Sequence, residues 1–170
     1  MHIARRNTVI AAAGLAAAGI GLGAGPAAAR AGDAATLAAH LLDAFTRRDL
    51  PALVAAMAPA VVVEQPYQLP GQPDRFEGRA AVEAFFARLF EQFSAARFVG
   101  TPRISPFADG RGVVVETSGD FVLAGSGRPY RNRYVFVLEL DAAGRVAAFR
   151  EYFNPLAVAE IVGLRLAEAR

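Results

Sequence analysis

A carboxylate within an apolar row is the feature of this sequence that points most directly to chemistry. In the last strand-like run, alternation places Glu151 on the same side as Phe149 and Phe153. If a two-residue hairpin loop precedes this strand, Tyr134 of the preceding strand faces Glu151, and Asn132 faces Phe153. Apolar surroundings raise the pKa of a carboxylic acid toward the range useful for general acid or base catalysis. We therefore predict that Glu151 transfers a proton while Tyr134 and Asn132 orient a substrate oxygen.

Glu116 is the second catalytic candidate, and its orientation depends on the loop at residues 125–127. A three-residue loop points Glu116 the same way as Tyr134, whereas a two-residue loop points it outward. Alternatively, Glu151 has a structural role and forms an ion pair with an arginine, because structural ion pairs also shift the pKa of a carboxyl group. Its partner would be Arg133 or Arg150, although alternation puts both arginines on the opposite face.

The candidate substrate-binding residues are aromatic, amide or imidazole side chains. Several of them have an ordinary structural alternative: the polar residues of the strands could be satisfied sheet residues, and His40 lies in an apolar helical stripe where a core histidine is common. His40 and Gln65 are expected at the mouth or floor of a pocket. The full set is Tyr130, Asn132, Tyr134, His40, Gln65 and Tyr67.

Composition excludes several classes of site. The chain has 170 residues with no cysteine, and all 18 of its basic residues are arginine. A lysine Schiff base, a phosphate-loop lysine, a thiolate nucleophile and a thiolate-ligated metal site are therefore excluded. With only His2 and His40, a histidine-rich metal centre is excluded as well. We expect no metal and no cofactor, which leaves carboxylate, tyrosine, arginine or amide chemistry.

The elements that must position these residues are helices first and strands afterwards. Apolar periodicity predicts helices, and β-branched or alternating runs predict strands. This order indicates an α+β fold, with an antiparallel meander curling over the first helix. The helices are expected at 33–48, 50–57, 78–93 and 156–162, and the strands at 61–65, 97–104, 112–123, 128–140 and 145–154.

The first thirty residues resemble an export signal. Arg5 and Arg6 precede an uncharged stretch rich in alanine and glycine, and small residues close it at a cleavage position after Ala29 or Ala31. We predict a signal peptide of the twin-arginine type over 1–31, an exported location in the periplasm or outside the cell, and one domain over 32–170. An N-terminal membrane anchor is the alternative, although the glycine and alanine content argues against it.

Removal of the first 31 residues would leave 15 arginines against 16 carboxylates, a net charge of −1. No basic stripe with interleaved aromatic residues is present in that part, so we expect neither nucleic acid binding nor stable membrane association after cleavage. The outer face of the sheet is expected to carry enough apolar area for a homodimer. Its apolar residues would be Val135, Val137, Val146, Ala148 and Tyr152.

Three short motifs resemble a known family. Residues 150–155 (REYFNP), 130–132 (YRN) and 64–66 (EQP) are similar in order and spacing to the SnoaL-like branch of the nuclear transport factor 2-like superfamily, from about Asp33 to the C-terminus. The resemblance implies a cone formed by a curved antiparallel sheet packed on three N-terminal helices. It also implies a deep, mostly apolar pocket and, commonly, a dimer. Such cones hold isomerases, cyclases, hydrolases, dehydratases and non-catalytic ligand binders.

The resemblance can be compared with known activities position by position. Ketosteroid isomerases carry an aspartate and a tyrosine where this chain has Gln65 and Leu41. The phenazine biosynthesis A/B proteins are closer in motifs, since they match at Glu116, at residues 130–132 and at the acid/base carboxylate Glu151, but their proton-donating histidine falls near Phe85. Limonene epoxide hydrolases match at Glu151, but Ser118 or a nearby small residue replaces their arginine.

We therefore predict a pocket protein for a small, largely apolar molecule. The leading hypothesis is cofactor-independent acid/base chemistry, namely an isomerisation, cyclisation or hydration. The alternative is a non-catalytic exported ligand-binding or accessory dimerisation module, which the missing partner residues favour. Whether the protein is an enzyme at all stays open on the sequence alone.

Overall fold

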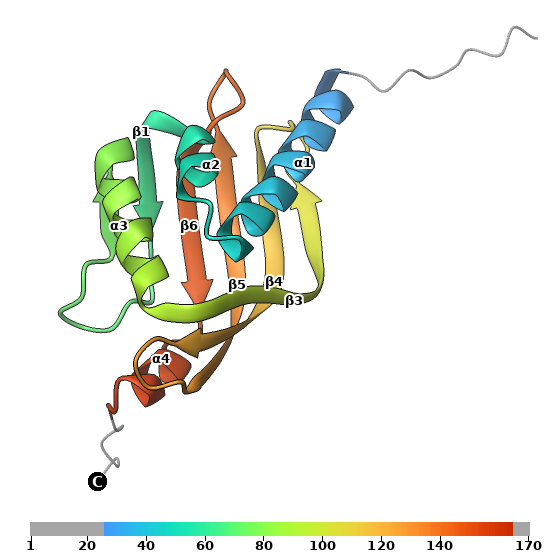
Figure 1. The fold of residues 1–170 in the computed structure, drawn as a ribbon. Coiled ribbons are helices and arrows are strands. Elements are labelled where there is room, and N and C mark those ends of the chain that lie inside the picture. The colour runs from blue at the N-terminus through green and yellow to red at the C-terminus, as the bar shows by residue number, and fades with distance from the viewer. Residues whose placement is uncertain (1–25, 165–170) are drawn as a thin grey trace, which may run out of the picture.

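The computed structural model describes residues 26–164 as one open, mixed sheet with helices on one of its faces (Figure 1). The helices are α1 (Pro26–Thr46), α2 (Leu50–Ala55), α3 (Arg79–Glu91) and α4 (Pro155–Ile161). The strands are β1 (Met57–Glu64), β2 (Arg75–Glu77), β3 (Phe93–Pro106), β4 (Gly112–Leu123), β5 (Pro129–Leu140) and β6 (Val146–Phe153). The predicted α+β class is confirmed, and β2, which lies in a segment without a predicted strand, is the added element.

The strand order β2-β1-β6-β5-β4-β3 combines a meander with one parallel pair. Strands β3 to β6 form the predicted antiparallel meander, and β1 pairs with β6 in parallel. The sheet is therefore mixed instead of purely antiparallel as expected. Because β6 lies between β1 and β5, the last strand of the sequence is hydrogen-bonded to the first.

Local sequence explains where the helices begin. Asp49 caps α2 by accepting a hydrogen bond from the Ala52 amide at 3.0 Å, with Pro51 in the first turn. Asn154 caps α4 in the same way, because its side chain accepts a bond from the Leu156 amide at 3.0 Å. The longer helices α1 and α3 each bury one apolar stripe against the sheet. These stripes are Ala34, Ala38, Leu41 and Ala44 in α1, and Val82, Phe85, Phe86 and Phe90 in α3.

The register of β5 and β6 differs by two residues from the predicted one. Phe136 faces Glu151 and Tyr134 faces Phe153, where the sequence analysis paired Tyr134 with Glu151. The cause is the turn at residues 141–145, in which the Asp141 side chain accepts bonds from the Ala143 and Arg145 amides and Gly144 has a φ of 77°. A bulge after this turn shifts the pairing. Because the shift is even, Glu151 stays on the predicted face.

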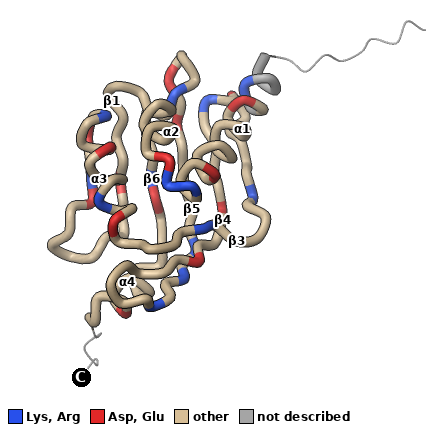
Figure 2. The backbone as a smooth tube through the Cα atoms, in the orientation of Figure 1, with Lys and Arg blue, Asp and Glu red and all other residues tan. Residues whose placement is uncertain are grey.

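The same bulge corrects the prediction for the outer face of the sheet. Val146, expected to be exposed there, is completely buried, since the extra residue reverses its direction. Val135 keeps 36% of its surface exposed on that face. Ion pairs such as Arg150–Glu139 and Arg103–Glu116 surround it, and acidic and basic residues are interspersed along the chain (Figure 2). Within residues 26–164, no helix has the length and hydropathy needed to cross a membrane.

Candidate functional site

A pocket of about 790 Å³ lies between the concave face of the sheet and the helices. This volume is within the range of about 300–1,000 Å³ that is typical of small-molecule sites. Its walls are mainly aromatic and aliphatic, with side chains from all four helices, the sheet, the loop between β1 and β2 and the residues directly after α4. The polar residues among the described lining are Gln65, Gln68, Gln72, Arg88, Gln92, Tyr130, Tyr134 and Glu151.

Glu151 lies in this lining, on β6, opposite Phe136 of β5. Its carboxylate has one hydrogen-bond partner among the described residues, the Gln65 side chain, whose Nε2 donates to Oε2 at 2.6 Å. Burial raises the pKa of Glu151 from 4.5 to about 7, and the hydrogen bond from Gln65 opposes part of that rise. A carboxyl group of this kind is present in both protonation states near neutral pH. The prediction that Glu151 faces an apolar pocket is confirmed.

Gln65 belongs to a short chain of amide hydrogen bonds that begins in the loop between β1 and β2. The Leu69 amide donates to Gln68 Oε1 at 2.8 Å, and Gln68 Nε2 donates to Gln65 Oε1 at 3.0 Å. Because its oxygen is held in this way, the buried Gln65 side chain directs its NH₂ group toward Glu151. Gln65 thus lines the pocket as predicted, and it orients the carboxylate.

Two tyrosines of β5 supply hydroxyl groups to the pocket. Tyr130 Oη accepts hydrogen bonds from Asn132 Nδ2 at 2.7 Å and from Tyr134 Oη at 3.4 Å. Burial raises the pKa of both phenols, so both stay protonated. Within residues 26–164, the proton of the Tyr130 hydroxyl has no acceptor. Tyr130 is therefore the phenol free to donate to a bound molecule.

Asn132 was predicted to bind substrate, but it is not part of the pocket lining. Its side chain is buried on the same face as the tyrosines, but all of its hydrogen-bonding capacity is used within the protein. Besides Tyr130, Nδ2 donates to the Asn154 carbonyl at 3.0 Å, and Oδ1 accepts from the amides of Arg133 and Asn154 at 2.8 and 2.9 Å. Asn132 thus positions the Tyr130 hydroxyl and ties β5 to the start of α4, and the prediction that it binds substrate directly is corrected.

Three further predictions are corrected by position. Glu116 points to the outer face, where half of its side chain is exposed and it pairs with Arg103 at 3.4 Å, because it faces Val135 and not an inward residue. His40 is exposed on α1, outside the buried stripe. Tyr67 is 56% exposed, and its ring packs against Tyr152 at 5.6 Å. None of the three belongs to the pocket lining.

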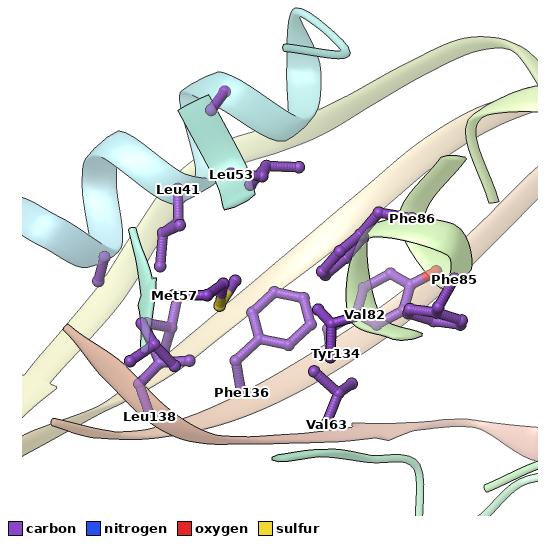
Figure 3. Packing of buried hydrophobic residues seen from close by; sticks show 14 of the residues in the cluster. Leu41, Leu53, Met57, Val63, Val82, Phe85, Phe86, Tyr134, Phe136 and Leu138 are labelled. Carbon is purple, nitrogen blue, oxygen red and sulfur yellow. The ribbon is translucent and has the colours of Figure 1, made fainter. Parts of the chain in front are cut away.

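The pocket has a polar half and an apolar half along the strands. Toward the α4 end of β5 and β6, Glu151 comes first, and Tyr134 and then Tyr130 follow; Gln65 continues β1 at the level of Glu151. Leu138 and Met57 lie toward the opposite end, under α1 and α2. In Figure 3, Leu41, Leu53, Met57 and Leu138 form one end of the core cluster, with Phe136 between them and the Tyr134 side. The polar groups of the sheet therefore gather toward the α4 end, beside apolar side chains of α4, whereas the opposite end is lined by apolar side chains.

Several pocket residues escaped the sequence analysis. Arg88 and Gln92 lie on α3 and at its C-cap, and Gln68 and Gln72 lie in the loop between β1 and β2. The helical spacing of Phe85, Arg88 and Gln92 was a usable signal, because these residues fall on one helix face. Within the described residues, no group of three His, Cys, Asp or Glu side chains is arranged to hold a metal ion.

Comparison with known proteins agrees with this geometry. The SnoaL-like domain matches residues 38–158. The Bacillus subtilis protein YesE is 35% identical over 102 residues, which cover 60% of this chain and 68% of YesE. A PhzA/B-like protein of Pseudomonas aeruginosa is 34% identical over 105 residues, covering 62% and 72%. The crystal structure of a provisionally named isomerase from Bacillus subtilis matches with a TM-score of 0.71 and 27% identity, covering 81% of this chain and 97% of that one.

Proposed function

Because this chain belongs to the SnoaL-like domain family, we propose that it is an enzyme that moves a proton within a small, largely apolar substrate, and that Glu151 carries that proton. The single observation that carries the proposal is the Glu151 carboxyl group in an apolar pocket, with a pKa of about 7 and one amide partner. Such a group can accept a proton at one moment and return it at the next.

Gln65 determines which carboxyl oxygen does this. Its NH₂ group donates a hydrogen bond to Oε2 whether Glu151 is ionised or protonated, because an amide can donate to a carboxylate or to the carbonyl oxygen of the acid. Oε1 is then the atom that takes up and releases the proton. The bond to Gln65 also limits rotation of the carboxyl group, which keeps Oε1 directed at one place in the pocket.

Tyr130 supports the complementary role at the substrate oxygen. A neutral phenol whose oxygen already accepts two hydrogen bonds is a strengthened donor, because the bonds polarise one another. Its free hydroxyl proton would donate to a carbonyl oxygen on which negative charge grows during the reaction. Tyr134 and Asn132 hold that hydroxyl in place.

These roles combine into a balanced reaction. Oε1 of ionised Glu151 removes a proton from a carbon next to a carbonyl, the C–H electron pair moves to form an enolate, and Tyr130 hydrogen-bonds to the enolate oxygen. The protonated Glu151 then returns the proton to another carbon of the same molecule. The product is then an isomer of the substrate. If the enolate carbon instead attacks a second carbonyl carbon, a C–C bond closes a ring, the C=O π pair moves to that oxygen, and the protonated Glu151 returns its proton to the resulting alkoxide. The name of the Bacillus subtilis neighbour, an isomerase, agrees with this class.

The test is exchange of carbon-bound hydrogen in D₂O, followed by NMR with 2-tetralone and related aromatic ketones as probes. We expect the wild-type protein to accelerate exchange next to the carbonyl, and Glu151→Gln to lose that acceleration by about a hundredfold or more. Glu116→Gln is the matched control, because it makes the same change on the outer face and should keep full activity. Equal exchange by wild type and Glu151→Gln would show that another group moves the proton.

A ligand-binding role without chemistry is the alternative outcome of the same experiment. Ketones that bind to the wild-type protein but exchange no faster than in buffer would support that role. Export by the twin-arginine route and assembly as a homodimer belong to the proposal too. Export rests on the Arg5–Arg6 pair before the alanine-rich stretch, and the dimer rests on the exposed Val135 at the centre of the uncovered sheet face.

A further inference from the structure

The charged residues of the pocket lining bear on which molecules the pocket accepts. Among the described lining residues, only Glu151 and Arg88 carry a formal charge. Arg88 lies in the last turn of α3 and is exposed. Within residues 26–164 its guanidinium has neither an ion pair nor a hydrogen bond, whereas Arg103 and Arg97 form ion pairs with Glu116 and Asp120. Arg88 is therefore a cation available to a ligand.

The helical geometry places this cation at the mouth of the pocket. Phe85, Arg88 and Gln92 are spaced three and four residues apart, so they share one face of α3. Phe85 is buried against the pocket and Gln92 lines it, which brings the Arg88 side chain along the same wall. In Figure 1 the C-terminal end of α3, the loop between β1 and β2, and α4 lie at the same end of the molecule. The pocket opens there, because the exposed residues of the described lining lie in the loop between β1 and β2, at the end of α3, and directly after α4.

We propose that the pocket takes an apolar organic acid, and that Arg88 binds its anionic group at the mouth while the apolar body extends past Glu151 toward Met57 and Leu138. This inference rests on the proposed function, since it specifies the substrate class for the same pocket. It is supported by the polar and apolar halves of the lining and by the free guanidinium at the polar end. Gln92, one turn further along α3, offers an amide beside the same position.

A structural role for Arg88 predicts something different. A cation in the last turn of a helix interacts favourably with the negative end of the helix dipole, and this effect stabilises the fold without regard to any ligand. Loss of that effect would lower the stability of the protein and change the affinity for anionic and neutral ligands equally. A specificity-determining role affects anionic ligands and spares neutral ones.

A matched pair of dyes separates these roles. 8-Anilinonaphthalene-1-sulfonate and N-phenyl-1-naphthylamine share one aromatic body, and only the first carries an anionic group. We expect Arg88→Gln to weaken binding of the sulfonate about five- to tenfold and to leave binding of the neutral dye within about twofold. Added salt should weaken sulfonate binding to the wild-type protein more than to Arg88→Gln. Arg103→Gln, which removes an arginine from the outer face, should leave both dyes unchanged.

The position of the dyes can be checked directly, because the sequence contains no tryptophan. Phe149→Trp places a single energy donor in the pocket lining. We expect energy transfer from this tryptophan to both bound dyes. Sulfonate that binds without energy transfer lies outside the pocket, and that result would overturn the inference.

The remaining outcomes are equally decisive. Equal weakening of both dyes by Arg88→Gln, or no weakening of the sulfonate, would overturn the role of Arg88 while binding of the neutral dye still supported a small-molecule pocket. Failure of the wild-type protein to bind either dye would count against both this inference and the proposed function. Unfolding of Arg88→Gln in urea, compared with wild type, shows whether a change in fold contributes.

Discussion

The Glu151 carboxyl group combines two opposing influences on its protonation. Removal from bulk water favours the neutral acid, and the Gln65 amide favours the ionised form. The first influence is larger, so the pKa lies near 7 and the group is poised for proton transfer at neutral pH. The corresponding cost appears in the stability of the fold, because the native state must ionise a carboxyl group that the unfolded chain ionises easily.

A pH dependence of stability follows from this difference. The pKa of Glu151 is raised from 4.5 to about 7 on folding, so its contribution to stability is complete below about pH 4.5 and is lost as the pH rises through about 7. We expect the free energy of unfolding of wild type to fall relative to Glu151→Gln by about 2–3 kcal/mol between pH 4.5 and 8. Urea denaturation at a series of pH values measures it, with Glu116→Gln expected to parallel wild type. A constant difference between wild type and Glu151→Gln would show that Glu151 titrates normally.

Strand β4 has a glycine, Gly119, where the rings of Phe121 and Tyr134 pack closely against its backbone. A Cβ atom added to Gly119 would lie 2.3 Å from a ring carbon of Phe121 and 2.8 Å from a ring carbon of Tyr134, so both rings would have to move. We expect Gly119→Ala to destabilise the protein by about 1–3 kcal/mol, as measured by urea denaturation. Gly32→Ala on α1 is the matched control, because no atom lies within 4 Å of its added Cβ, and it should be neutral or stabilising by up to about 1 kcal/mol. Equal effects of the two substitutions would mean that the rings adjust freely.

The order of the elements and the direction of Glu151 could be predicted from the sequence because both depend on local periodicity. Strand β4 occupies the expected residues 112–123, and α3 lies within the predicted 78–93. The parallel pairing of β1 with β6 could not be predicted in this way, since it joins residues about 85 positions apart and leaves no local pattern. The exposure of His40 could not be predicted either. Spacing along a helix shows which residues share a face, but only the folded structure shows which face packs against the sheet.

Turn geometry explains the errors at the site. The prediction for Tyr134 and Glu151 assumed a two-residue loop, whereas the turn at residues 141–145 and its bulge move the register by two. Similarly, the direction of Glu116 depends on the turn between β4 and β5, which places it opposite Val135. The role of Asn132 depends on Asn154, which is 22 positions away in the sequence. The Asn132 side chain donates a hydrogen bond to the Asn154 carbonyl and accepts one from the Asn154 amide. Such contacts exist only in the folded chain.

At the scale of the whole molecule, the open sheet and its helices separate two surfaces with different chemistry. The concave face holds the pocket, in which Arg88 and Glu151 are the only charged residues of the described lining. The opposite face carries ion pairs around the exposed side chain of Val135. Arg30, Gly32 and Asp33 of α1 are exposed, and among the α1 side chains that the structure describes the first buried one is that of Ala34.

This arrangement makes the predicted cleavage after Ala31 testable as a question of stability. A chain that begins at Gly32 keeps Ala34, Ala38 and the hydrogen bond from Thr36 Oγ1 to the Gly32 carbonyl. We expect its free energy of unfolding in urea to equal that of the full chain within about 1 kcal/mol. A chain that begins at His40 loses both buried alanines and should be less stable by at least about 1–2 kcal/mol. If the chain from Gly32 were as unstable as the chain from His40, the domain would need residues that cleavage after Ala31 removes, and the boundary between signal and domain would have to lie nearer the N-terminus.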